Sequence, residues 1–202
     1  MADAKLLVFS GPSGTGKGTI LNKLIAKGNY SFSVSMTTRL PRPGEVDGRE
    51  YYFVSKDVFK KTIAEGGLLE YVDKFENFYG TPKAPILEML AKGQNIILDI
   101  EMQGALNVKK AYPEAVLVFV LPPSLAILRE RLLGRGTETP EQVAVRTADI
   151  KKELAFIKDY DYYIVNENLD DAVSCVEDIV SGQGETHRVS DPEFIIKKYM
   201  EE

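Results

Sequence analysis

Short, nearly uninterrupted apolar runs alternate along the chain with longer amphipathic segments. Runs typical of buried strands occur at Leu6–Ser10, Asn95–Ile100, Val116–Leu121 and Tyr162–Val165. Apolar residues with helical spacing occur at Lys17–Lys27, Gly104–Ala111, Ser124–Leu133, Thr139–Ile157 and Asp170–Val180. Strands that are apolar on both faces and separated by helices are typical of a parallel sheet with helices on both sides. The pattern therefore predicts an α/β fold.

The segment from about residue 35 to residue 93 departs from this alternation. Tyr51–Val54 and Leu68–Val72 have the pattern of short strands, and Ser55–Ala64 that of a short helix. An insertion of this size between the first and second core strands is where a second substrate would dock. We therefore expect one domain at 1–182, with a core at 1–34 and 94–182, an inserted α+β subdomain at about 35–93 and a helical lid at about 134–150, followed by a tail at 183–202 with a short helix.

The most informative motif directly follows the first apolar run. Residues 11–19 read Gly-Pro-Ser-Gly-Thr-Gly-Lys-Gly-Thr. The glycines let the backbone curl so that successive N–H groups point at phosphate oxygens. The following helix adds the positive end of its dipole, and Lys17 adds a mobile charge for the outer phosphates. A simple strand-to-helix turn requires neither this lysine nor four glycines, so the motif predicts a nucleoside triphosphate site.

One position departs from the common form of this motif. Gly18 follows Lys17, and Thr19 comes one residue later, whereas the common pattern places a magnesium-ligating Ser or Thr directly after the lysine. We therefore expect Mg²⁺ to be held mainly by phosphates and water. Small nucleotide kinases tolerate a glycine at this position, whereas GTPases, which depend on the hydroxyl, generally do not.

Two further segments carry groups suited to phosphoryl transfer. Arg39 and Arg42 lie in a turn stiffened by two prolines, which can clamp an anion with little loss of entropy. Asp99 ends an apolar strand, where a carboxylate commonly lies near the magnesium ion of a phosphate loop. The alternatives are a solvated basic turn for the arginines and a helix cap for the aspartate.

A third segment, Arg131–Thr139, places arginines beside glycines, and Arg146 follows on the next predicted helix. Such arginines can close over a phosphoryl group and neutralise the charge of the transition state. Helices also carry surface arginines freely, and this alternative is stronger for Arg131 and Arg146 than for Arg135.

The composition limits where the protein works and what it binds. A net charge of −5 over 202 residues gives no general attraction to nucleic acid. No apolar run approaches membrane-spanning length and no signal peptide is recognisable, so we expect a cytoplasmic protein without a membrane partner. The single cysteine, Cys175, is expected to be a buried thiol in a reducing compartment.

With these residues together, the chain resembles the guanylate kinase family from about Leu6 to Val180, nearly its whole length. The joint order and spacing of several motifs carry the resemblance: the phosphate loop, Ser-x-Thr-Thr-Arg-x-Pro-Arg-x-Gly-Glu at 35–45, Gly-Arg-Glu-Tyr-Tyr-Phe-Val at 48–54, Tyr-Gly-Thr at 79–81, Leu-Asp-Ile-Glu-Met-Gln-Gly at 98–104, Gly-Arg-Gly-Thr-Glu-Thr at 134–139 and Val-Asn at 165–166. The resemblance implies a P-loop kinase core and phosphorylation of GMP, and of dGMP, by ATP in purine nucleotide metabolism.

The resemblance also implies roles for individual positions. For ATP it implies the loop residues Gly11, Pro12, Ser13, Gly14, Thr15, Gly16, Lys17, Gly18 and Thr19, with Asn166 and Glu167 near the adenine. For GMP it implies Arg39, Arg42, Tyr51 and Tyr79 on the phosphate, and Ser35, Glu70, Thr81 and Glu101 around the guanine. The implied catalytic residues are Lys17, Arg42, Arg135 and Arg146, with Asp99 at the metal. Family members vary between Ser and Thr at position 81 and between Asp and Glu at position 101.

The implied base specificity has a physical basis of its own. Guanine presents N1–H and an N2 amino group side by side, and one carboxylate, such as that of Glu70, can accept from both. Adenine has a lone pair at N1 and no amino group at C2. A site built to pair a substrate N–H rejects analogues that lack it by about 10⁴–10⁵-fold.

Three other functions compete with this one. A GTPase would require Asn-Lys-x-Asp on a late strand, where this chain has Asn166-Glu167-Asn168-Leu169. A kinase for AMP or UMP is the second, and an assay with a panel of monophosphates separates it. An inactive guanylate-kinase-like scaffold is the third; such modules typically lose the phosphate loop and the lid arginines, whereas Lys17, Arg135 and Arg146 are present here.

Overall fold

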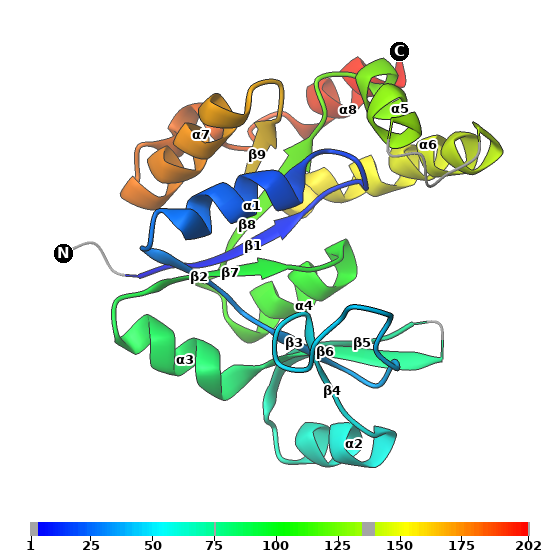
Figure 1. Ribbon diagram of the computed structural model, residues 1–202. Coiled ribbons are helices and arrows are strands. Elements are labelled where there is room, and N and C mark those ends of the chain that lie inside the picture. The colour runs from blue at the N-terminus through cyan, green and yellow to red at the C-terminus, as the bar shows by residue number, and fades with distance from the viewer. Residues whose placement is uncertain (1–3, 75, 135–139, 202) are drawn as a thin grey trace.

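The computed structural model describes residues 4–74, 76–134 and 140–201, without the side chains of residues 140–142, 144–146 and 151. A five-stranded sheet forms its centre, and a four-stranded sheet lies below it in the view of Figure 1. Within these described ranges, no helix is both long and apolar enough to cross a membrane.

Every strand of the central sheet runs parallel to its neighbours. The order is β2–β7–β1–β8–β9, formed by Tyr30–Phe32, Asn95–Asp99, Leu6–Ser10, Val116–Leu121 and Tyr162–Val165. The first strand is thus central, and the chain adds strands on one side of it before it crosses to the other. The loop after β1 therefore lies at the point where the strand order reverses, which is the usual ligand site of an open α/β sheet.

Alternate residues of the central strands pack against helices on opposite faces. Leu7 and Phe9 share a hydrophobic cluster with helices α1 (Lys17–Ala26) and α7 (Leu169–Ser181). Leu6 and Val8 share the other cluster with α3 (Lys83–Ala91), α4 (Met102–Ala111), α5 (Leu125–Leu133), α6 (Pro140–Leu154), the 3-10 helix η1 (Ala155–Asp159) and α8 (Pro192–Met200). The strands form continuous apolar runs because both faces are buried. The expected fold class is confirmed.

The second sheet is mixed, in the order β4–β3–β6–β5, formed by Tyr51–Phe53, Ser35–Thr37, Asn77–Pro82 and Leu68–Lys74. Strand β3 is parallel to β4 and antiparallel to β6, which pairs antiparallel with β5. Helix α2 (Lys56–Ala64) covers this sheet through Phe59, whose buried ring stacks on Phe78 with centroids 5.4 Å apart. The inserted sheet therefore has a small aromatic core of its own.

The C-terminal tail ends in the expected short helix, after a 3-10 turn, η2 (Gly184–His187). Asp191 caps helix α8 by accepting a hydrogen bond from the N–H of Phe194 at 2.9 Å. The ring of Tyr199 is almost fully buried, and its hydroxyl donates to the carbonyl of Pro122, just after β8. The tail is thereby fastened to the central sheet.

Candidate active site

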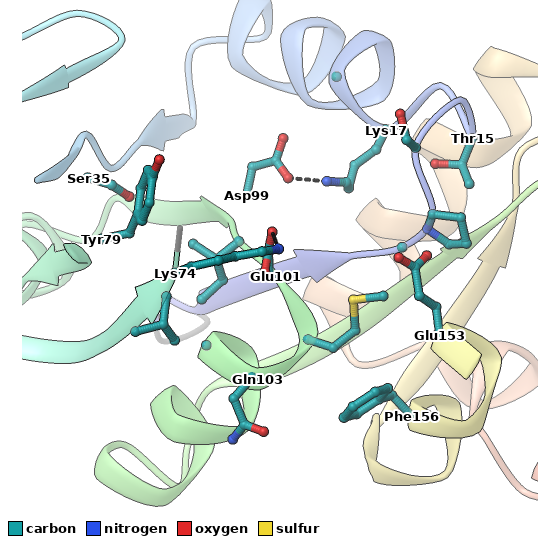
Figure 2. Close-up of a pocket in the computed structure, with 18 of the residues that line it drawn as sticks. Thr15, Lys17, Ser35, Lys74, Tyr79, Asp99, Glu101, Gln103, Glu153 and Phe156 are labelled. Carbon is teal, nitrogen blue, oxygen red and sulfur yellow. Dashed lines mark hydrogen bonds and ion pairs between the residues drawn. The ribbon is translucent and has the colours of Figure 1, made fainter. Parts of the chain in front are cut away.

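A cavity of about 780 Å³ opens between the phosphate loop and the inserted sheet. Its lining includes Gly11–Gly18 of the loop, residues 99–104 from the end of β7 onward, Arg42 in the turn between β3 and β4, and polar residues on the strands of the inserted sheet: Ser35, Tyr51, Glu70, Lys74 and Tyr79. Glu153 and Phe156, at the end of α6 and in η1, line the remaining side. Figure 2 shows Lys17, Asp99, Glu101 and Glu153 converging from three directions. Most of the residues expected around the two nucleotides therefore meet in one place.

The phosphate loop has the conformation that its glycines predict. Gly16 is the N-cap of α1 and has φ of +82°, where a side chain is strained. A Cβ at Gly16 would also lie 2.3 Å from Nδ2 of Asn166, so the position excludes larger residues. That amide nitrogen donates to the carbonyl of Thr15 at 2.7 Å. The loop is thus closely packed on its outer side.

Arg131 supports the loop from the same side. Its guanidinium donates to the carbonyl of Thr15 at 3.3 Å and to the carbonyl of Asn166 at 3.0 Å. Asn166 is buried, and Glu167 is exposed; neither is among the residues that line the cavity. In this structure Asn166 contacts the loop backbone, and the expected place of Asn166 and Glu167 beside adenine stays a prediction.

Lys17 and Asp99 form an ion pair in the cavity, marked by the dashed line in Figure 2. Parallel pairing aligns Asp99, the last residue of β7, with Phe9 of β1, so it ends close to the loop that carries Lys17. Gly18 also lines the cavity, whereas Thr19 is exposed on α1 and is not among the lining residues. Among the described residues, no group of three or more His, Cys, Asp or Glu side chains has the arrangement of a metal site.

A buried carboxylate lies at the far end of the cavity. Glu70 is 7% exposed, and β5 pairs it directly with Thr81 of β6, whose hydroxyl donates to Oε1 at 2.7 Å. A Cβ at Gly104 would lie 3.2 Å from Oε2, so the glycine leaves room for this carboxylate beside α4. Burial raises the pKa of Glu70, and the hydrogen bond from Thr81 partly opposes that rise. Thr81 itself does not line the cavity; it acts through Glu70.

The two arginines of the proline-containing turn have different surroundings. Arg39 makes two hydrogen bonds to Glu45, at 2.9 and 3.0 Å, and its guanidinium lies over the Tyr51 ring, 5.4 Å from the centroid. Arg42 lines the cavity and is exposed, and its backbone N–H donates to Glu45 at 2.7 Å. The turn is therefore organised by Glu45, and Arg39 reaches the cavity only through Tyr51.

Two tyrosines flank the same end of the cavity. The rings of Tyr51 and Tyr79 meet edge to face with centroids 6.1 Å apart. Burial raises the pKa of Tyr51, so its hydroxyl remains a proton donor at neutral pH. Ser35 also lines this region, from β3. The site thus offers neutral hydroxyl donors beside the positive charge of Arg42.

Neither of the two lid arginines has a side chain that the structure describes. Arg135 lies outside the described residues, and Arg146 belongs to α6, but its side chain is not described. The end of the same helix does contribute Glu153. Burial raises the pKa of this carboxyl, and the charges of Asp149 and Glu101 add to the rise, whereas those of Lys74 and Lys17 oppose it.

Sequence reasoning did not find Lys74 and Glu153 as cavity residues. Lys74 could have been found from strand alternation, because Glu70, Val72 and Lys74 lie two residues apart and share one face of β5. Glu153 gives no such signal, since it reaches the cavity only through the packing of α6 and η1 on the core. The capping of the arginine turn by Glu45 was also not recognised.

Comparison with known proteins agrees with this geometry. The family model described as guanylate kinase matches residues 3–183. A guanylate kinase from Clostridioides difficile is 50% identical over 199 residues, covering 98% of this chain and 96% of its own. One from Clostridium tetani is 46% identical over 183 residues, with coverage of 91% and 88%.

A solved structure extends the comparison to the fold. The crystal structure of guanylate kinase from Anaplasma phagocytophilum superposes with a TM-score of 0.71 at 30% identity, covering 94% of this chain and 92% of the other. The expected family and the expected activity, ATP-dependent phosphorylation of GMP, are confirmed. This chain belongs to the guanylate kinase family.

Proposed function

We propose that phosphoryl transfer from ATP to GMP takes place in the cavity between the two sheets. The observation that carries this proposal is that one cavity joins the phosphate loop of the core to the buried Glu70 carboxylate of the inserted sheet. The loop is a site for ATP phosphates, and the carboxylate is a site for a base with adjacent N–H groups. A nucleotide at each end would bring two phosphates together between them.

Glu70 is the group proposed to read guanine. Its Oε1 already accepts from Thr81, which fixes the plane of the carboxylate, and each carboxylate oxygen can accept more than one hydrogen bond. N1–H and the N2 amino group of guanine would supply donors to a buried anion whose only described side-chain donor is a hydroxyl. Ser35 and Glu101 also line the cavity and are proposed as further contacts of the base.

The phosphate of GMP is assigned to Arg42, Tyr51 and Tyr79. Arg42 gives a positive charge on the exposed rim, and the tyrosine hydroxyls give neutral donors that need no change of charge. Arg39 is proposed to share its guanidinium between Glu45 and the phosphate, because its two bonds to Glu45 leave other N–H donors in the fork.

The ATP phosphates are assigned to Lys17 and to the backbone N–H groups of Gly11–Gly18, except at Pro12, which has none. The Lys17 ammonium pairs with Asp99 in this structure, and ATP would compete with the carboxylate for that charge. Asp99 fits Mg²⁺ as a single carboxylate ligand or through water, since magnesium keeps several waters and takes phosphate oxygens besides one or two carboxylates. When bound, the ion would neutralise charge on the phosphates.

Positioning and charge account for the chemistry that these residues perform. The attacking oxygen of GMP is already anionic near pH 7, so no side chain has to remove a proton. The loop and Lys17 would hold the transferred phosphoryl group in line with that oxygen, and Arg42 would hold the acceptor. Arg135 and Arg146 are proposed to complete the positive surround from the lid side.

The experiment that tests this function is ADP release measured with ATP and each of GMP, dGMP, AMP, UMP and CMP. GMP should be turned over, and AMP should be weaker by about 10⁴-fold, because the carboxylate would face a lone pair. We also expect turnover of dGMP, because the proposed base contacts do not involve the 2′-hydroxyl. Equal activity with all five nucleotides, or none with GMP, would contradict the assignment.

A further inference from the structure

Three charged side chains from different elements line the cavity. Lys74 is the last residue of β5, Glu101 precedes α4, and Glu153 lies near the end of α6. Figure 2 shows the Lys74 side chain running toward the Glu101 carboxylate, with Glu153 extending from α6 on the opposite side. These residues belong to the inserted sheet, to the core and to α6, most of which falls within the lid expected at about 134–150.

Lys74 faces the cavity because of its register on β5. It shares one strand face with Val72 and Glu70, and all three line the cavity. Lys74 lies four positions after Glu70, which corresponds to about 13 Å along a strand. The lysine is therefore too far along the strand to read the same base edge as Glu70, and its effect must pass through a nearer group.

That nearer group is Glu101. The Lys74 ammonium pairs with Oε1 of Glu101 at 2.5 Å, a contact that joins the inserted sheet to the core. Glu101 is also the N-cap residue of α4, yet its side chain makes no capping hydrogen bond. The carboxylate is thus held toward Lys74 instead of folding over the exposed N–H groups of its own helix.

The charges of Lys74 and Glu101 also affect Glu153, another carboxylate that lines the cavity. The Glu101 charge adds to the rise in the pKa of Glu153 that burial causes, and the Lys74 charge opposes it, so both groups act on Glu153. Without the lysine, Glu101 would lose the cation that it pairs with and would lie in the same cavity as a second carboxylate, that of Glu153.

We propose that Lys74 is a positioning residue for GMP, whose ammonium group holds the Glu101 carboxylate inside the cavity. The inference rests on the proposed function, because it takes GMP as the ligand and Glu101 as a contact of the base. The two side chains are 39% and 60% exposed, so their pairing contributes little to the stability of the fold. We therefore expect the loss of this ion pair to change ligand binding and not the stability of the fold.

A double-mutant cycle with K74M and E101Q tests this inference, read as kcat and as KM for GMP and for ATP. K74M should raise KM for GMP about three- to tenfold and leave kcat and KM for ATP within about twofold. In the E101Q protein, K74M should change KM for GMP by less than about twofold, because the group that it positions has lost its charge. K74R should leave KM for GMP close to the wild-type value, since arginine keeps the positive charge.

The matched control is K92M. Lys92 also pairs with a glutamate, Glu88, but on the exposed surface of α3, so K92M should leave all three constants unchanged. An unchanged KM for GMP in K74M, a similar rise in the E101Q background, or an equal rise in KM for ATP would overturn the inference. If K74M does not fold, as judged by circular dichroism, K74Q is scored by the same criteria. A wild-type protein that does not phosphorylate GMP would overturn the proposed function, and this inference with it.

Discussion

The central sheet and the inserted sheet border the same cavity, but they differ in burial. All five residues of β1 are buried, as are five of the six residues of β8. In β5 only Leu69 and Glu70 are buried, and one of these is a carboxylate. The central strands therefore supply most of the hydrophobic stabilisation, whereas the inserted strands keep polar side chains at the surface that substrate would touch.

The two sheets also contribute to the cavity in different ways. The central sheet contributes through the segments after its strands, namely the loop after β1 and residues 99–104 at the end of β7. The inserted sheet contributes through a strand face, with Glu70 and Lys74 projecting from β5 itself. The core thus offers loop backbone and the side chains of Lys17 and Asp99, and the insertion offers strand side chains whose replacement should alter specificity more than folding.

Phe119→Ala should cause the largest change in stability. The Phe119 ring on β8 is fully buried and meets Tyr160 edge to face with centroids 5.0 Å apart. Its loss should lower the free energy of unfolding by about 3–5 kcal/mol, measured by urea denaturation.

Phe59→Ala, in the aromatic core of the insertion, is the comparison: local opening of that unit should raise KM for GMP with a smaller loss of global stability. If both variants lost the same free energy of unfolding and Phe59→Ala left KM for GMP unchanged, the proposed difference in stability between the two sheets would be wrong.

Lys17→Met should cause the largest change in catalysis. It removes the charge on the ATP side of the cavity, so kcat should fall by about 100-fold or more. The affinity for GMP, measured by calorimetry, should stay within about twofold, because no proposed GMP contact is lost. Lys23→Met, which removes an exposed lysine of the same helix, is the control and should retain activity. Near-normal kcat in Lys17→Met would refute the assignment of the loop.

Glu70→Gln should weaken GMP binding without affecting ATP. The amide brings donors of its own, one of which would face a guanine donor, so GMP affinity should fall by about 2–4 kcal/mol. ATP affinity should hardly change, since the loop lies at the other end of the cavity. Equal losses for both nucleotides would show that Glu70 has a structural role.

The raised pKa of Glu70 gives the same site a pH dependence. Because burial raises this pKa above its usual value of 4.5, the ligand-free protein is stabilised by the proton at low pH and loses that contribution as the pH rises through the raised pKa. If the ionised carboxylate reads guanine, as proposed, GMP affinity should fall as the pH drops through that same pKa. Calorimetry on Glu70→Gln is the control: it retains the titration of the GMP phosphate, and only the wild type should show the additional loss.

The sequence was most informative where both faces of an element are buried. Three of the four predicted core strands, β1, β8 and β9, have the expected bounds, because an apolar run has no other stable location. Strand β2 was not predicted, since Tyr30–Phe32 is a three-residue edge strand with a partly polar pattern. Helix α3 was not predicted either, because it contains Pro85, which a helix tolerates only in its first turn.

Prediction of the cavity residues was limited in the same way, to those that a local sequence pattern reveals. The phosphate loop could be predicted because its chemistry lies within nine consecutive residues. Strand alternation could place Lys74 on the same face as Glu70, but its pairing with Glu101 and the place of Glu153 in the cavity could not be predicted, because they depend on how β5 and α6 pack beside α4. Local sequence determines which groups a segment can offer, and only the tertiary packing determines which of them share a cavity.

Tyr199→Phe should have the smallest effect, and it tests whether the tail belongs with the core. The tail begins where the family match ends, at residue 183, yet Tyr199 is buried against the end of β8 through its bond to the Pro122 carbonyl. Loss of that hydrogen bond should cost about 1 kcal/mol and lower the melting temperature by about 2–4 °C. Phe194→Ala, at a side chain on the same helix that is 68% exposed, should leave the melting temperature unchanged. Because α8 packs mainly on η1 and α6, KM for GMP should also stay the same in Tyr199→Phe. A raised KM without a change in melting temperature would place the tail with the substrate-binding region instead.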